Sequence, residues 1–223
     1  MEIKINSSIC TKVPEIKIGF IHYENIKVDA SPQMLKGRLQ LFQESIFFDL
    51  QDKPLIDVEG IKEWRQIFKK TGKDPNRYRH SAEALYRRIK KQNYLSTINS
   101  AIDLNNFFSL QYEVPIGIYN LDKLTGKEIQ LKIASENETY TGLNSRENSL
   151  ENLIVSCDQK GAFGSPFVDS DRAPVNNCTK NAIQIVYLKP SLPIEEANRL
   201  TDSLMKMFLQ IHGGSGTYKV VSC

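Results

Sequence analysis

The sequence lacks long apolar runs and paired cysteines, and each absence excludes a class of protein. No apolar stretch approaches the roughly 18 residues that a membrane-spanning helix needs, and residues 1–10 lack the basic and then apolar pattern of a secretory signal. We therefore expect a soluble protein of the cytoplasm with no membrane partner. No CxxC pair occurs, so neither a zinc site nor a disulfide framework is predicted. We expect reduced thiols at the four cysteines, which are Cys10, Cys157, Cys178 and Cys223.

The common sequence signatures of catalysis and phosphate binding are also missing. The chain has no HExxH, no Walker loop, no nucleophile triad and no paired carboxylates at useful spacing. His22 has no second ligand type at metal spacing, so neither a metal nor a cofactor is expected. Residues 212–216 resemble a glycine-rich phosphate nest, but such nests precede helices and this run follows a predicted one, where glycine is the ordinary cap.

What the sequence does have is a concentrated positive charge. The chain has 223 residues, of which 40% are apolar. Residues 62–91 carry eleven Lys or Arg against three acids, and we call residues 62–91 the cationic segment. Such a segment either attracts a polyanion through counterion release, with Tyr78, Tyr86 and Tyr94 stacking on bases, or is a solvated helix face. The candidate RNA contacts are Arg65, Lys69, Lys70, Arg77, Arg79, Arg87, Arg88, Lys90 and Lys91.

Hydrophobic periodicity predicts alternating helices and strands. A hairpin is expected from residues 16–21 and 26–28, and a helix capped by Ser31 follows it. Further helices are predicted at 58–70, after a cap at Ser81, and at 194–211. Strands are predicted at 128–134, 153–157 and 182–188, whereas residues 161–175 are interpreted as a loop.

The stretch 98–124 combines a predicted helix with a short apolar strand that Pro115 opens. Asp103, Asn105 and Asn106 fall where the chain should be largely buried. A buried carboxylate or amide without a hydrogen-bond partner costs roughly 1–3 kcal/mol. These three side chains are therefore either a structural lock or part of a site.

An ordered set of short motifs gives the chain a family resemblance. Ile-Asp-x-x-Asn at 102–106, Pro-x-x-x-Tyr at 115–119 and Leu-Asp-Lys-Leu-x-Gly at 121–126 are similar to the tRNA-binding and editing module of the bacterial phenylalanyl-tRNA synthetase beta subunit. Ile-x-x-Trp-Arg at 61–65, Tyr-Arg-x-Ser-x-Glu-Ala-Leu at 78–85 and Ser-Asp-Arg at 170–172 resemble free-standing proteins made of that module alone. The likeness spans about residues 55–215.

The resemblance implies a fold and an organisation. We expect an α/β (α+β) protein with mixed sheets, flanking helices and two intimately joined lobes. Residues 55–223 would form the module, and residues 1–54 would extend it with a hairpin and a helix.

The resemblance also implies a site at the seam of the two lobes, where the synthetase module hydrolyses wrongly charged aminoacyl-tRNA. Asn106 matches the module's asparagine and is the candidate catalytic residue, while Gly161 or Gly164 falls near its glycine-rich pocket turn. Gly117 replaces the histidine of that module and Ile185 replaces its glutamate, so a pocket lined by Gly and Ile loses two polar contacts. Arg172 could bind a carboxylate or phosphate, or pair with Asp169 or Asp171.

Two hypotheses follow from these residues. The first is a tRNA-binding protein that deacylates mischarged aminoacyl-tRNA in trans; full ligase activity is not expected. The second is a non-catalytic module that binds RNA or a small anionic metabolite with Arg79 and Arg172. Arg79 could instead form an ion pair with Asp74 or Glu83.

Overall fold

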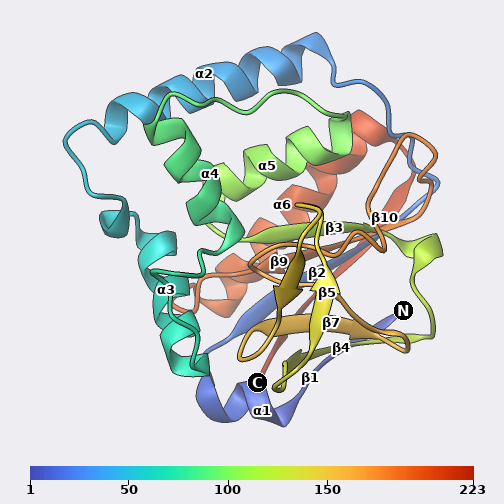
Figure 1. The fold of residues 1–223 in the computed structure, drawn as a ribbon. Helices are drawn as coiled ribbons and strands as arrows, with labels where there is room; N and C mark the ends of the chain where they lie inside the picture. The colour runs from blue at the N-terminus through green and yellow to red at the C-terminus, as the bar shows by residue number, and fades with distance from the viewer.

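Two four-stranded sheets frame the molecule in the computed structural model, which describes residues 1–223 (Figure 1). Neighbouring strands pair antiparallel except for β1 and β4, which run parallel. The first sheet has the order β1 (Glu2–Ile5), β4 (Glu128–Ile133), β7 (Ile154–Asp158), β8 (Gly161–Gly164). The second has the order β10 (Ser215–Ser222), β2 (Lys17–Glu24), β9 (Ala182–Tyr187), β3 (Ile116–Asn120). A separate ribbon pairs β5 (Thr139–Thr141) with β6 (Glu147–Ser149).

Helices cover the second sheet. The helix α5 (Ser100–Tyr112) contacts β3, and α6 (Ile194–His212) contacts β2 and β10. Outside α5 lie α2 (Gln33–Asp49) and α4 (Ser81–Lys90), with α2 along one edge of the molecule (Figure 1). The remaining elements are α1 (Ser7–Lys12), α3 (Glu59–Thr71) and the short 3-10 helices η1 (Leu55–Asp57) and η2 (Leu121–Lys123). This arrangement confirms the predicted α/β class with mixed sheets and flanking helices. None of these helices combines the length and apolarity that crossing a membrane requires.

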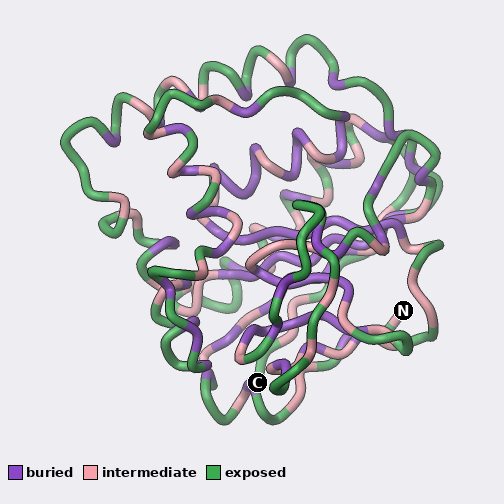
Figure 2. Tube along the Cα trace, viewed as in Figure 1, coloured by how far each residue is buried: buried purple, intermediate pink, exposed green.

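The core lies between these layers, where Figure 2 shows the strands and the inward helix turns as buried. Trp64 is fully buried, and its indole nitrogen donates a 2.9 Å hydrogen bond to the Tyr187 carbonyl. This bond anchors α3 to the last residue of β9. The helices predicted at 58–70 and 194–211 and the strands predicted at 128–134, 153–157 and 182–188 are confirmed within one or two residues.

The N-terminal predictions were partly wrong. No hairpin forms at 16–28, because residues 17–24 are one strand, β2, which pairs with β10 on one side and β9 on the other. Ser31 does not cap α2; its hydroxyl donates to Asp103 Oδ2 at 2.5 Å, and Pro32 precedes the helix without a side-chain cap. The cap of α4 is His80, whose Nδ1 accepts from the Glu83 amide at 3.3 Å, rather than Ser81.

Two glycine-rich stretches also differ from their predictions. Residues 161–164 were predicted as loop but form the edge strand β8, which pairs with β7 through an irregular register. The run 212–216, which resembles a phosphate nest, is the turn from α6 into β10. Gly213 and Gly214 have φ angles of 65° and 77°, positive values that glycine adopts without strain.

The expectation of reduced thiols is wrong for two of the four cysteines. Cys10, in α1, is disulfide-bonded to Cys223, the last residue of the sequence, with a Cα–Cα distance of 5.4 Å. The two lie 213 residues apart, so only the fold brings them together: β10 runs along β2 toward the end at which α1 lies. Cys157 and Cys178 are free.

Candidate functional site

The seam between the two sheets, where the resemblance places a pocket, is filled by the side chain of Tyr119. Tyr119 lies in β3 of the second sheet and is 1% exposed. A Cβ atom added at Gly117 of the same strand, or at Gly164 of β8 in the first sheet, would collide with the Tyr119 hydroxyl. The two glycines therefore form a slot that the tyrosine ring occupies.

The Tyr119 hydroxyl is held by a carboxylate. It donates a 2.6 Å hydrogen bond to Asp169 Oδ1, and its ring meets Phe163 edge-on at 4.8 Å between centroids. Burial raises the pKa of Asp169 to about 6, and the hydrogen bond from Tyr119 opposes that rise. The slot is thus closed by a short polar contact whose acceptor has a raised pKa.

Two further tyrosine hydroxyls are satisfied in the same region. Tyr187 of β9 and Ser156 of β7 are 3.1 Å apart at their hydroxyl oxygens, a hydrogen bond that joins the two sheets. Tyr140 of β5 donates to the Val168 carbonyl and lies 3.0 Å from the Ser165 hydroxyl. The polar groups of the seam therefore bond to one another and leave few donors or acceptors for a ligand.

The other predicted substrate contacts also have partners within the chain. Ile185 is completely buried and sits opposite Gly117 in the β3–β9 register. Arg172 pairs with Asp158 through two hydrogen bonds of 2.9 and 3.1 Å, and it also donates to the carbonyl of Gly161 at 3.0 Å. The ion-pair interpretation of Arg172 was therefore right in kind but wrong in partner, because neither Asp169 nor Asp171 takes part. Burial favours a higher pKa at Asp158, but the hydrogen bonds from Arg172 and from the Thr125 and Lys160 amides together outweigh it, so the pKa is lowered.

The three polar residues predicted to be buried in α5 differ in their hydrogen bonding. Asp103 accepts hydrogen bonds from Ser31 and from the Ile98 amide. Asn105 donates to the Ile116 carbonyl at 2.9 Å and accepts from Gln184 at 2.9 Å. Both are structural locks. Asn106 is half-buried and its side chain makes no hydrogen bond.

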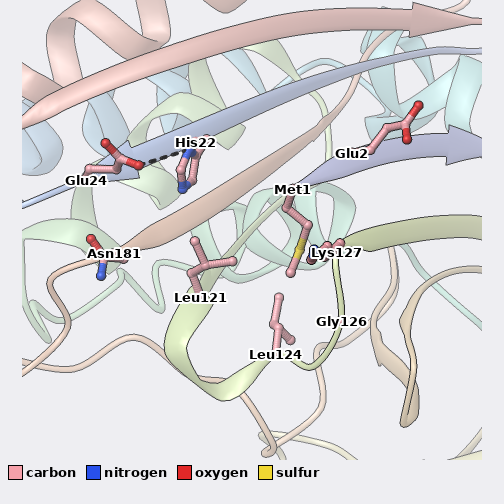
Figure 3. A pocket seen from close by; sticks show the side chains of 9 residues that line it. All are labelled: Met1, Glu2, His22, Glu24, Leu121, Leu124, Gly126, Lys127 and Asn181. Carbon is pink, nitrogen blue, oxygen red and sulfur yellow. Dashed lines mark ion pairs between the residues drawn. The ribbon is translucent and has the colours of Figure 1, made fainter.

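Five surface hollows lie away from the seam. None of these five is lined by Asn106 or by a predicted substrate contact. One of about 550 Å³ opens between β1, β2 and the segment that leads into β4 (Figure 3). There His22 Nδ1 lies 3.9 Å from Glu24, and burial lowers the pKa of His22. Leu121, Leu124 and the exposed Lys127 line the other side.

The cationic segment is organised around one buried carboxylate. Glu83 of α4 is completely buried and accepts from Arg65 at 3.0 Å and from Arg87 at 2.9 Å. Arg65 also donates to the Pro75 carbonyl and to Asn76. These bonds hold α3, the turn at 75–80 and the first turn of α4 together, so residues from all three elements are brought close to one another.

The nine predicted RNA contacts differ in how their charge is used. Arg65, Arg87 and Lys70 are in ion pairs, the last with Glu15, and Lys90 donates to the Lys53 carbonyl. The other five are exposed and form no ion pair within the chain: Lys69, Arg77, Arg79, Arg88 and Lys91. The proposed pairing of Arg79 with Asp74 or Glu83 is therefore wrong.

The aromatic part of the RNA prediction needs correction. Tyr86 is 6% exposed and donates to the Leu110 carbonyl, so its ring is unavailable for stacking. Tyr78 is half-buried; it meets Phe167 edge-on at 5.6 Å and carries the Lys73 ammonium over its face at 4.0 Å. The Tyr78–Phe167 contact and a hydrogen bond from the Ser81 amide to the Pro166 carbonyl hold the turn at 75–80 beside the loop that carries Asp169.

Sequence reasoning missed the pair that Tyr119 and Asp169 form in the seam. Side chains two apart on a strand share a face, so Tyr119 next to Gly117 was a readable signal for a ring lying over a glycine. Nothing in the sequence linked Tyr119 to Gly164 or to Asp169, because Gly164 lies in a different sheet and Asp169 in a loop.

Comparison with known proteins bears on the family. The profile of the B3/4 domain family matches residues 63–203. A Bacillus subtilis (strain 168) protein, "Uncharacterized protein YhzB", is 36% identical over 217 residues, which is 97% of this chain and 98% of that protein. The phenylalanine–tRNA ligase beta subunit of Fusobacterium nucleatum is 30% identical over 99 residues, or 43% of this chain but only 12% of that subunit.

One solved structure aligns with the whole chain. It is an N-terminal fragment of the phenylalanyl-tRNA synthetase beta subunit from Pyrococcus horikoshii, with a TM-score of 0.49, 14% identity and coverage of 100% of this chain and 54% of that one. The family resemblance drawn from the motifs is confirmed by the profile and by the sequence relatives. Since the profile covers more than half of the sequence and the B. subtilis relative aligns over nearly all of it, this chain belongs to the B3/4 domain family.

Proposed function

We propose that this protein binds tRNA through the cationic segment and does not use the seam between its sheets as a hydrolytic pocket. The observation that supports binding is the set of five exposed cationic side chains, from Lys69 to Lys91, that no carboxylate of the chain neutralises. The observation against hydrolysis is Tyr119, which occupies the slot between Gly117 and Gly164.

The physical basis of the binding is electrostatic. Each phosphate that a Lys or Arg neutralises releases condensed counterions, and this release supplies most of the affinity for a nucleic acid when few bases are read. Arg77 and Arg79 lie in the turn that Arg65 and Glu83 hold in place, so their guanidinium groups are presented on a fixed backbone. A fixed backbone lowers the entropy that is lost on binding.

The relatives support a nucleic-acid partner. Several of them are named phenylalanine–tRNA ligase beta subunits, and a tRNA ligase must contact tRNA. The family profile begins at residue 63, so it includes nearly all of the cationic segment. These subunits extend far beyond the matched part, so their catalytic activity belongs to them and is not proposed for this chain.

The test is a binding measurement with unacylated tRNA. In fluorescence anisotropy at moderate salt, replacing Arg77, Arg79 and Arg88 together by alanine should weaken binding by about 10- to 100-fold, since three phosphate contacts are lost. The control replaces three ion-paired cations outside the segment, Lys27, Arg199 and Lys206, and so removes the same net charge. Equal weakening in both variants would show that only net charge matters and would contradict the proposal.

Deacylation in trans is a second candidate, and the side chain of Asn106 is the observation that favours it. This amide is half-buried and makes no hydrogen bond, so a ligand could use it. A panel of misacylated tRNAs incubated with the protein separates the two functions. Binding alone predicts no ester hydrolysis above the uncatalysed rate, whereas a rate that disappears in Asn106→Ala would establish the hydrolase.

A small anionic metabolite at Arg79 and Arg172 is less well supported than tRNA. The Arg172 guanidinium is engaged by Asp158 and by the Gly161 carbonyl. A metabolite would have to displace those bonds, which are charge-assisted and among the stronger ones in the protein.

Binding of tRNA would place the protein in the cytoplasm, where thiols are kept reduced. In that compartment the disulfide between Cys10 and Cys223 would be subject to reduction. Alkylation of the protein directly in lysed cells, followed by mass spectrometry of both cysteine peptides, measures the fraction bonded. A fully bonded pair would argue for an oxidising compartment and against cytoplasmic tRNA as the partner.

A further inference from the structure

The helix α2 exposes an apolar stripe that the fold leaves uncovered. Met34, Leu41 and Phe48 are 81%, 68% and 66% exposed, and successive members are seven residues apart. Seven residues are nearly two helical turns, so the three side chains lie on one face. The opposite face, with Leu35, Leu39 and Ile46, is buried against the molecule, and Figure 2 shows the outward turns of α2 as exposed.

The charges of α2 are arranged against its own dipole. Lys36 and Arg38 lie in the N-terminal half, and Glu44 and Asp49 lie in the C-terminal half. A single helix is stabilised by the reverse arrangement, with acids first and bases last. None of the four is in an ion pair within the chain. Glu44 accepts a 2.7 Å hydrogen bond from Gln40, and the Arg38 guanidinium lies 5.6 Å from the centre of the Phe107 ring. The four side chains therefore have no partner of opposite charge within the chain.

We propose that a second copy of this chain supplies that partner, by antiparallel packing of α2 on α2 about a two-fold axis at Leu41. With Leu41 facing its own mate, every other position pairs with the one equally far on the opposite side. Arg38 then meets Glu44 of the second copy, and Met34 meets Phe48. One symmetry operation buries the apolar stripe and matches the charges of Arg38 and Glu44, as an isologous interface requires. Lys36 and Asp49 lie outside these pairs.

Two features of the surface beside α2 are compatible with this pairing. Gly37, which faces Ser45 of the second copy, has no atom within 4 Å of where its Cβ would be, so the two backbones can approach closely. Beside Met34 an apolar hollow of about 140 Å³ is lined by Leu104 and Phe107 of α5 and by Ile211 of α6. The Phe48 ring of the second copy lies nearest to this hollow.

The interface is independent of the proposed RNA contacts, because α2 contributes none of them. Sedimentation equilibrium on the purified full chain tests it without RNA. The wild type should associate to twice the mass of one chain, and Leu41→Lys should reduce it to the mass of one chain while thermal unfolding stays cooperative. The control Leu143→Lys changes an apolar residue of similar exposure, 55%, away from α2 and should remain a dimer. A monomeric wild type, or a dimer that survives Leu41→Lys, would overturn the proposal.

Charge reversal tests the antiparallel register. Arg38→Glu and Glu44→Arg should each weaken the association constant by about tenfold or more, because like charges then face each other. The double variant restores the pairing and should recover most of the wild-type constant. If the double variant associates no better than either single one, the register and with it the proposal are wrong.

Crosslinking gives a second readout. In a Cys178→Ser background, Leu41→Cys places two thiols across the axis and should form a disulfide-linked dimer under mild oxidation, whereas Leu143→Cys should not. Absence of the crosslink at Leu41, or equal crosslinking at both positions, would contradict the axis.

Discussion

The seam and the cationic segment are both polar, but they differ in where their polar groups find partners. In the seam, the hydroxyls of Tyr119 and Tyr187 bond to groups of the same chain, and the slot between two glycines is full. In the cationic segment, Glu83 neutralises two guanidinium groups, but Arg77, Arg79 and others have no carboxylate partner. A region whose polar groups are satisfied stabilises the fold, whereas one with exposed unmatched charge has binding energy left for another molecule.

The largest effect should come from adding one carbon to the seam. Gly164→Ala places a Cβ against the Tyr119 hydroxyl, and such overpacking should lower the free energy of unfolding by about 3 kcal/mol or more, measured by urea denaturation. In a Tyr119→Ala background the same change should cost far less, because the obstructing ring is gone. Additive costs would mean that the ring does not fill the slot.

A smaller loss of unfolding free energy is expected when the Glu83 carboxylate is replaced by a neutral amide. Glu83→Gln breaks two partly buried ion pairs and should cost about 1–3 kcal/mol of unfolding free energy. The freed guanidinium groups of Arg65 and Arg87 should raise tRNA affinity a few-fold, measured by anisotropy. Glu63→Gln removes an equal charge without freeing a guanidinium, because Glu63 bonds Ser191, and should raise the affinity less.

The Asp169 carboxyl should make the seam sensitive to pH. Its folded pKa of about 6 lies above the ordinary value near 3.9, so the folded state holds the proton more tightly than the unfolded chain. The unfolding free energy from this group is therefore greatest below about pH 4 and falls as the pH rises through 6. Asp169→Asn removes that fall while keeping an acceptor for Tyr119. Between pH 4 and 7 the variant should gain about 1–3 kcal/mol relative to wild type; a difference that does not change with pH would contradict this.

The smallest effect on stability should occur in the cationic segment itself. Arg79→Ala removes an exposed side chain without an ion pair, so the unfolding free energy should change by no more than about 0.5 kcal/mol. The tRNA affinity should nevertheless fall several-fold. Arg65→Ala is the contrasting variant: it loses bonds to Pro75, Asn76 and Glu83 and should destabilise the protein. If Arg79→Ala destabilises as much as Arg65→Ala, the distinction between binding and structural cations fails.

The sequence predicted the helices and strands whose apolar residues recur at a regular helical or strand spacing. The helices around Trp64 and Leu204 and the strand around Ile185 have such patterns, and each was found within two residues. The C-terminal strand β10 was missed because most of its side chains are exposed and polar, and its position follows from pairing with β2. β8 was missed because it contains two glycines in four residues, a composition typical of loops.

The candidate site was less predictable because it depends on contacts between distant parts of the chain. The basic segment and the burial of Asp103 and Asn105 follow from local composition and periodicity, and both could be predicted. The pairing of Arg172 with Asp158 and of Tyr119 with Asp169 joins different elements, and no spacing in the sequence encodes it. The disulfide between Cys10 and Cys223 was unpredictable for the same reason.

The most direct test of binding at the cationic segment is the salt dependence of tRNA affinity. The logarithm of the association constant should fall linearly with the logarithm of salt concentration, by about 0.9 for each phosphate neutralised. Replacing Arg77, Arg79 and Arg88 by alanine should make the slope shallower by about 2 to 3 units. A flat wild-type response, or an unchanged slope in the triple variant, would contradict the assignment of this segment as the RNA-binding surface.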